Sequence, residues 1–196
     1  MAKYQRLYPG CFYHIYNRGN RGEILFREDR NFNYFLSLYG KYIRPIADTY
    51  CYCLLPNHFH FLVRIKEQES IDDDLISWSS RAFSNLFSTY TKAINQAFQR
   101  SGSLFEKPFK RKHIDVDRYL FQLVIYIHRN PQKHGLVKDF RDWTYSSYPA
   151  IIGYGSTRIQ RGEVLKLFGG REGFVKSHSI AEVEGIIKIQ FFDNVD

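Results

Sequence analysis

The spacing of hydrophobic and polar residues changes several times along the chain, and each change predicts a new element. Residues 11–19 read as a strand that runs into a glycine-containing turn. Residues 29–44 carry apolar side chains at helical spacing, and this helix is expected to end before Pro45. Residues 48–55 and 58–65 lie on either side of a Pro-Asn break, which predicts the two arms of a hairpin.

The second half of the chain begins with a long helical pattern. Residues 70–100 predict one or two helices, closed by a Ser-Gly-Ser sequence. The basic segment 105–116 is expected to end in a short strand, and residues 118–129 predict a helix that stops before Asn-Pro. Further helical pieces are expected near residues 163–168 and 181–190.

This order of elements predicts an α+β fold. Strand, helix, strand, strand, helix, strand is the split β-α-β arrangement of ferredoxin-like and RNA-recognition domains, with four to five antiparallel strands in the sheet. We expect the helices on one face, which leaves the other face exposed for a site. The predicted domain occupies residues 1–150, and residues 151–196 are expected to form a partly helical C-terminal extension without an assigned function.

Two histidines on the second arm of the hairpin are the first candidates for chemistry. Because side chains in a strand alternate, His58 and His60 share one face, while Phe59 and Phe61 share the core face. The two imidazoles lie roughly 7 Å apart along the strand, since each residue rises about 3.3 Å. Neutral imidazole is the commonest metal ligand, so the pair can converge on one ion. Two half-exposed histidines without a role are the alternative.

The helix predicted over residues 118–129 leads into a second candidate pair. Tyr126 and Asn130 lie four residues apart and therefore stack on one helical face. A tyrosine hydroxyl acts as a nucleophile when a nearby group offsets the charge on its oxygen. An asparagine side chain is a neutral oxygen ligand for a divalent cation. The plainer alternative is that Tyr126 is one of fifteen tyrosines and that Asn130 caps the helix before proline.

Composition indicates a class of partner. Lys and Arg outnumber Asp and Glu by 28 to 20, and the sequence pI is about 9.3. This excess suits a polyanion, nucleic acid first. The three cysteines, Cys11, Cys51 and Cys53, lack zinc-site spacing and indicate a reduced, cytoplasmic environment. No apolar run approaches the ~20 residues that a membrane span needs, and no secretory signal opens the chain, so an intracellular protein without membrane contact is expected.

Several motifs together resemble one family. A hairpin containing PNHFH and a later helix reading YIHRNP resemble the single-tyrosine HUH transposases, where HUH denotes two histidines around a bulky apolar residue. The resemblance is closest to the branch of REP-associated tyrosine transposases. It extends over most of residues 10–150 and includes YHIYNRGNRGEILF (13–26), LFEKPFKRK (104–112) and DWTYSSY (142–148).

The resemblance implies a role for each candidate. His58 and His60 are the implied ligands of a divalent metal, Asn130 the third ligand, and Tyr126 the nucleophile. The implied cofactor is Mg²⁺ or Mn²⁺, although imidazole ligands by themselves favour Mn²⁺ or Zn²⁺. The implied reaction cleaves and rejoins single-stranded DNA near hairpins, through a covalent link between the tyrosine and the 5′-phosphate.

Basic residues near these motifs are candidates for DNA binding. Lys and Arg neutralise phosphates, and exposed aromatic rings stack on bases. Phe105 and Phe109 are interleaved with basic residues and are expected either to stack on bases or to pack in the core. His14, on the predicted first strand, is a further residue that could border the site. The basic candidates are Arg18, Arg21, Lys107, Lys110, Arg111 and Lys112.

Three other functions stay open. A nucleic-acid-binding module without catalysis shares the predicted fold, but the signature of RNA-recognition domains is absent from the sequence. A metal-dependent hydrolase, in which water attacks instead of Tyr126, would keep its activity when Tyr126 is changed to phenylalanine. A transposase that has lost mobility is the third. The resemblance allows a monomer or a homodimer, and the C-terminal extension favours the monomer.

Overall fold

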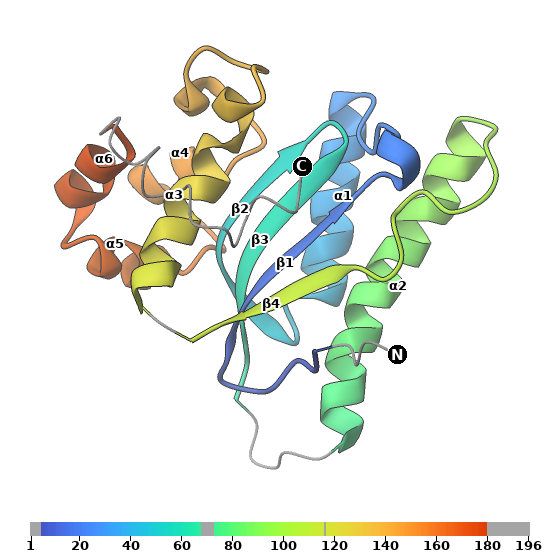
Figure 1. Ribbon diagram of the computed structural model, residues 1–196, viewed down its shortest axis with the longest axis horizontal. Coiled ribbons are helices and arrows are strands. Elements are labelled where there is room, and N and C mark those ends of the chain that lie inside the picture. Colours follow the sequence, from blue (N-terminus) through green and yellow to red (C-terminus); the bar gives the residue numbers. More distant parts are fainter. Residues whose placement is uncertain (1–4, 68–72, 116, 180–196) are drawn as a thin grey trace.

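A four-stranded antiparallel sheet is the centre of the computed structural model, which describes residues 5–67, 73–115 and 117–179 (Figure 1). The strand order is β2-β3-β1-β4, so the two arms of the predicted hairpin pair with each other and the first strand pairs with the second arm. The strands are β1 (Phe12–Arg18), β2 (Ala47–Leu55), β3 (His58–Ile65) and β4 (Lys110–Ile114). The α+β class and the antiparallel sheet are therefore confirmed.

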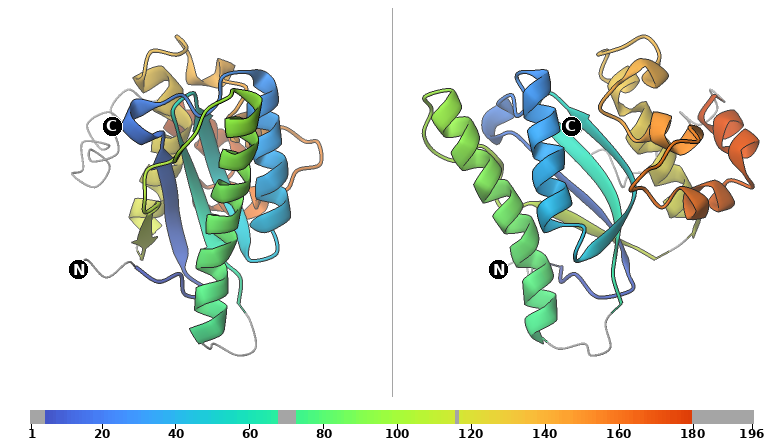
Figure 2. Two further views of the ribbon diagram at one scale, coloured as in Figure 1. Left: turned by 90° about the vertical axis from the view of Figure 1, so that its right-hand side faces the viewer. Right: turned by 180° about the vertical axis from the view of Figure 1, so that it is seen from behind.

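Helices lie on both faces of this sheet (Figures 1 and 2). Two long helices, α1 (Asp29–Tyr42) and α2 (Asp73–Ala97), pack on one face, and α3 (Asp117–Lys133) packs on β2 and β3 from the other. The shorter elements are η1 (Asn20–Gly22), η2 (Phe140–Asp142), α4 (Tyr148–Ile152), α5 (Arg161–Leu167) and α6 (Arg171–Ser179). Within the predicted segment 70–100, the structure describes one helix, α2, over residues 73–97.

Strand alternation separates two hydrophobic cores. Phe59 and Phe61 of β3 face α1 and α2, where they pack with buried aromatic residues such as Phe35. Leu62 faces α3 and packs in the second core with residues such as Val124. Burial of this second face removes further apolar side chains from water, which stabilises the fold by roughly 25 cal/mol for each Å² of apolar surface buried.

The second core corrects the expectation of an exposed face. His58 and His60 lie on the face that α3 covers, and His60 has no solvent-exposed surface. The sequence pattern was ambiguous here because the face carries polar side chains as well as Leu62, which suits a half-open sheet equally well. The candidate histidines are therefore buried between β3 and α3.

The end of α3 differs from the sequence-based expectation. The helix continues through Asn130 and Pro131 to Lys133 instead of ending before them. Pro131 lacks the N–H that would donate to the carbonyl of Ile127, but the chain still closes a further helical turn, in which the amide of His134 donates to the carbonyl of Asn130 at 3.0 Å. Asn130 is thus a buried residue inside the helix, and the reading of this residue as a helix cap is wrong.

The C-terminal part of the described chain packs against the rest. α5 confirms the helical piece expected near residues 163–168, whereas the piece expected over 181–190 lies outside the described residues. Ile151, Val164 and Phe174 are buried in the second core, beside α3. Whether residues 1–150 and 151–196 are separate units stays a prediction, but α4, α5 and α6 support the helix that carries Tyr126.

Candidate active site

Three elements bring the predicted site residues together between the sheet and α3. His58 and His60 lie on β3, and β3 pairs with β1 so that His60 is opposite Tyr16. Tyr126 and Asn130 are one turn apart on α3 and face β3. The ring centroids of His60 and Tyr126 are 5.5 Å apart, and Nε2 of His58 is 3.2 Å from Oδ1 of Asn130. Residues that are distant in sequence thus form one cluster.

His58 lies between two amide oxygens. Its Nδ1 is 2.7 Å from Oδ1 of Asn57, and its Nε2 faces Oδ1 of Asn130. A neutral imidazole has one N–H, so it can donate to only one of these oxygens. If the amide of Asn130 were turned over, its N–H would donate to His58 Nε2. Its oxygen would then take the buried position of Nδ2, which has no hydrogen-bond partner among the described residues. A cation held by His58 Nε2 and Asn130 Oδ1 would stabilise this contact.

His60 is positioned by a histidine that the sequence only suggested. Nε2 of His14 on β1 lies 2.9 Å from Nδ1 of His60, and both side chains are buried. The other nitrogen, Nε2 of His60, is buried and has no hydrogen-bond partner in the part of the chain that the structure describes. If His60 donates its Nδ1 proton to His14, Nε2 presents a lone pair to the cluster, as a metal ligand requires.

Burial keeps the imidazoles of His60 and His14 neutral. It lowers the pKa of His60 well below 6.5, and the neighbouring His14 and His58 act in the same direction. Burial and nearby Lys112 lower the pKa of His14 to about 3. A lone pair of His60 is therefore available at neutral pH. A donor set of two imidazoles and one amide oxygen suits a divalent cation such as Mn²⁺ or Zn²⁺.

Thiolate and carboxylate ligands do not contribute to this cluster. Cys53 on β2 pairs with His60 on β3. Burial raises the pKa of the Cys53 thiol, which therefore stays protonated. Across the described ranges, no group of three or more His, Cys, Asp or Glu side chains is arranged to hold a metal ion. A metal at this site would therefore depend on the amide oxygen of Asn130 beside the two histidines.

Tyr126 is buried between α3 and the sheet. Its side chain is 1% exposed, and its ring lies near His60 and, at 6.5 Å between centroids, near His14. The ammonium of Lys133 lies 5.5 Å from the centroid of the Tyr126 ring. The hydroxyl of Tyr126 is also buried, so it would have to become exposed before a large substrate could reach it.

The basic candidates divide between the two faces of the sheet. Directly paired residues on antiparallel strands share a face, and Arg18 pairs with His58 while Lys112 pairs with His14. Lys110 pairs with Tyr16, which stacks near His60, so it lies on the same face and is exposed. These three residues border the cluster, although Arg18 also forms an ion pair with Glu106 at 2.6 Å.

The other basic candidates lie elsewhere. Arg111 is on the opposite face, where it donates to Ser80 Oγ and lies 3.9 Å from the centroid of the Phe109 ring. Arg21 is exposed in η1, and Lys107 is exposed in the loop before β4. Phe105 and Phe109 are buried in the first core, so the expectation that they stack on bases is wrong, and the packing alternative holds.

A second buried histidine pair fixes α3 from the C-terminal side. His178 Nδ1 donates to the carbonyl of Phe174 at 2.8 Å, so its Nε2 accepts from His128 Nδ1 at 2.9 Å. Nε2 of His128 then accepts from Ser147 Oγ at 2.8 Å. The chain of donors has one direction, and it holds the turn of α3 between Tyr126 and Asn130. This pair was not predictable from the spacing of residues, because the two histidines are fifty positions apart along the chain.

This pair makes stability depend on pH. Burial lowers the pKa of His178 to about 4, whereas an unfolded histidine titrates near 6.5. Between these values the unfolded state binds more protons, so the free energy of unfolding decreases as the pH is lowered from 6.5 to 4, by about 3 kcal/mol for this residue alone. Urea unfolding across this range measures the effect. We expect the free energy of unfolding to decrease less in His178→Gln than in wild type, and as much in His113→Gln as in wild type. Equal slopes against pH in wild type and both variants would contradict the role of His178.

Comparisons with known proteins bear on the family that the chain resembles and on its fold. No family model matches the chain. A segment of 103 residues, 52% of the chain, is 29% identical to a curated protein of Haemophilus influenzae named "Putative REP-associated tyrosine transposase". The match spans 58% of the length of that relative.

The fold has a solved counterpart. A structure described as a REP-associated tyrosine transposase bound to a REP hairpin superimposes with a TM-score of 0.59 at 21% identity, over 84% of this chain and 93% of that one. No helix among the described residues is long and apolar enough to cross a membrane. The chain therefore resembles REP-associated tyrosine transposases, in sequence over half of its length and in fold over most of it.

Proposed function

We propose that this chain is a transposase that cleaves and rejoins single-stranded DNA beside hairpins, with Tyr126 as the nucleophile. The observation that supports it most is the convergence of His58, His60, Tyr126 and Asn130 between β3 and α3. The curated relative is named a tyrosine transposase, and the solved counterpart is described with a bound hairpin. The excess of Lys and Arg over Asp and Glu suits a DNA partner.

In the proposed reaction, the oxygen of Tyr126 attacks a phosphodiester. A bond forms between this oxygen and phosphorus, the phenol proton is lost, and the 3′-oxygen leaves and takes up a proton. The 5′-phosphate stays attached to the protein, and a second 3′-hydroxyl later displaces the tyrosine. One phosphodiester is exchanged for another of similar energy, so no nucleoside triphosphate is needed.

A divalent ion bound here would polarise the phosphate and stabilise its developing charge. His58, His60 and Asn130 are the residues that would hold it, and Mn²⁺ or Mg²⁺ is the proposed ion. His14 fixes the ring of His60, and the His128–His178 pair fixes the turn of α3 that carries Tyr126. The protein thus contributes position and a buried, low-dielectric surrounding to the reaction.

The test of this function uses the full chain and its own DNA. Single-stranded oligonucleotides that carry hairpins from the flanks of the gene are incubated with the protein and Mn²⁺ or Mg²⁺, and the strands are separated on a denaturing gel. The proposal expects cut strands and, with a second oligonucleotide present, rejoined strands of new length. Tight hairpin binding without cleavage in either metal would favour a binding module.

Two basic residues on the face of the site are expected to contact the DNA backbone. Lys110→Ala should weaken hairpin affinity severalfold and reduce the slope of log affinity against log salt by about 0.7 to 0.9, the value for one lost phosphate contact. Lys112→Ala should act in the same direction. Affinities measured between 50 and 200 mM salt, roughly the range over which such contacts weaken, give this slope.

Lys92→Ala is the matched control for these variants. Lys92 is an exposed lysine on α2, on the other side of the sheet from the candidate site. Its removal lowers the net charge by the same amount, so a general effect of charge would appear in all three variants. Equal salt slopes for Lys92→Ala and Lys110→Ala would show that the site face makes no specific backbone contact.

A further inference from the structure

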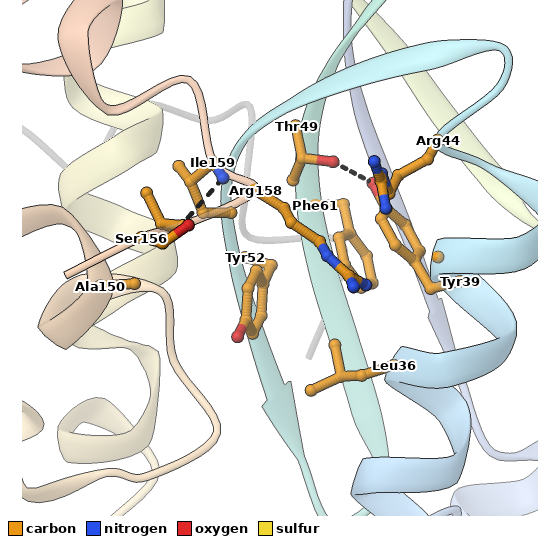
Figure 3. A pocket seen from close by; sticks show the side chains of 12 residues that line it. Leu36, Tyr39, Arg44, Thr49, Tyr52, Phe61, Ala150, Ser156, Arg158 and Ile159 are labelled. Atoms are coloured by element: carbon orange, nitrogen blue, oxygen red, sulfur yellow. Dashed lines mark hydrogen bonds between the residues drawn. The ribbon is translucent and has the colours of Figure 1, made fainter.

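A pocket of about 320 Å³ lies beside β2, on the face of the sheet that α1 covers (Figure 3). Its walls come from α1 and Arg44 just after it, from β2 and β3, from Ala150 of α4, and from residues 156–159, which run beside β2 before α5. Phe61 lines it, whereas His60, the next residue on β3, faces α3. The pocket is therefore on the opposite face of the sheet from the candidate active site.

Three aromatic rings contribute to one wall of this pocket: Tyr39 and Phe61 are buried, and Tyr52 is half-buried. Tyr39 and Phe61 stack with their centroids 4.2 Å apart, and Tyr52 lies beside Phe61 with centroids 5.6 Å apart. The hydroxyl of Tyr39 is held by Thr49 at 2.8 Å, which fixes the first ring. Such a wall suits a planar ring of a ligand, because aromatic rings pack well in stacked or edge-to-face contacts.

The polar groups of the pocket favour an anion. Arg44 and Arg158 line it, and none of its lining residues is acidic. Neither arginine has a carboxylate within 4.0 Å among the described residues. Figure 3 shows the Arg158 side chain reaching across the pocket toward Leu36. Two guanidinium groups without an acidic partner are suited to a phosphate, which they bind through paired N–H donors.

Two more residues of the lining shape the pocket. Gly40 lies in the last turn of α1, and a Cβ there would be 3.6 Å from Arg158 Nη1, which is an ordinary contact distance. The side chain of Arg158 therefore lies against this turn of the helix. Tyr52 lines the pocket, and burial raises the pKa of its hydroxyl, so this group is a protonated donor at neutral pH.

We propose that this pocket binds a nucleotide, with the phosphate on Arg44 and Arg158 and the base against Tyr39, Tyr52 and Phe61. The volume lies at the lower end of the range for small-ligand pockets, which suits one nucleotide and not a longer chain. Two sources share this chemistry, a free nucleoside monophosphate and an unpaired nucleotide of a bound DNA strand. Only the second source rests on the proposed function.

The first experiment titrates the full-length protein with each of the four deoxynucleoside 5′-monophosphates, and with inorganic phosphate alone, by calorimetry. We expect at least one nucleotide to bind more tightly than phosphate. Arg158→Ala should weaken the binding of this nucleotide by about tenfold or more, as expected for the loss of a charged hydrogen bond. Tyr52→Phe should weaken it less. No binding of any nucleotide, or equal binding by wild type and Arg158→Ala, would overturn the proposal.

Two controls locate the binding. Arg81→Ala removes an exposed arginine of α2, which contributes no residue to the pocket, and should bind the nucleotide as wild type does. His60→Gln alters the candidate active site on the other face and should also leave nucleotide affinity unchanged. Loss of binding in His60→Gln together with normal binding in Arg158→Ala would place the nucleotide at the active site and overturn the proposal.

A competition experiment then identifies the source. A hairpin oligonucleotide with an unpaired flank is added to the protein saturated with the best mononucleotide. If the DNA strand supplies the ligand, the oligonucleotide displaces the mononucleotide, and Arg158→Ala weakens both. If the ligand is a free nucleotide, both bind together. Either outcome supports the pocket, and because the titration needs no cleavage, its result is independent of whether Tyr126 acts as a nucleophile.

Discussion

Tyr126→Phe is expected to abolish DNA cleavage, with a loss of at least about a thousandfold in rate, because it removes the oxygen that attacks phosphorus. The ring stays in the second core beside His60, so folding should be nearly unchanged, with a free energy of unfolding within about 1 kcal/mol of wild type. Cleavage rates on a hairpin oligonucleotide and urea unfolding curves measure the two quantities.

Tyr119→Phe is the control for this variant. Tyr119 lies on the same helix but is half-exposed, away from the His60 cluster. The Tyr119→Phe protein should cleave the hairpin oligonucleotide at the wild-type rate. A Tyr126→Phe protein that keeps most of its activity would mean that water attacks the phosphate, and the chain would then be a metal-dependent nuclease.

His60→Gln is expected to have the next largest effect, because it removes the buried nitrogen that has no other partner among the described residues. We expect Mn²⁺ affinity to fall by at least about a hundredfold, beyond the 10- to 100-fold typical of residues that support a ligand. Cleavage should fall in parallel and should also stop when a chelator removes divalent ions from the wild type. Calorimetric titration with Mn²⁺ measures the affinity separately from activity.

Two further histidine variants make this test quantitative. His14→Gln should weaken the affinity for Mn²⁺ by about 10- to 100-fold, since His14 only orients the ring of His60. His113→Gln, on the other face of β4, should bind Mn²⁺ as wild type does. Unchanged Mn²⁺ affinity in His60→Gln would show that the cluster is not a metal site.

The sequence predicted the elements of the sheet well because their patterns are local. The arm over residues 58–65 coincides with β3, and the Pro-Asn break lies where the hairpin turns. The alternation of His58 and His60 with Phe59 and Phe61 also placed the histidines on one face correctly. Local spacing is enough for such features, since a strand fixes the direction of each side chain.

Features that depend on tertiary packing were not predictable in the same way. The sequence did not show that α3 would cover the histidine face, and Pro131 suggested a helix end where α3 continues to Lys133. The contact between His14 and His60 depends on the register of β1 against β3, which no local pattern specifies. The His128–His178 pair joins segments fifty residues apart and was likewise outside the reach of spacing arguments.

Arg111 shows the same limit for binding residues. It lies in a run of basic residues, and the sequence grouped it with Lys110 and Lys112. Strand alternation separates them, because Arg111 pairs with Ile15 and points to the first core, while its neighbours pair with Tyr16 and His14. A uniform basic segment therefore divides into two residues at the site and one that supports the packing of α2.

The most direct test of the central claim is to identify the residue that becomes attached to DNA. The protein is incubated with the hairpin oligonucleotide and Mn²⁺, denatured and digested, and the nucleotide-bearing peptide is sequenced by mass spectrometry. We predict a 5′-phosphate on the oxygen of Tyr126, absent from Tyr126→Phe and absent without metal. Cleaved DNA without any covalent peptide, or a nucleotide attached to another residue, would contradict the proposed role of Tyr126.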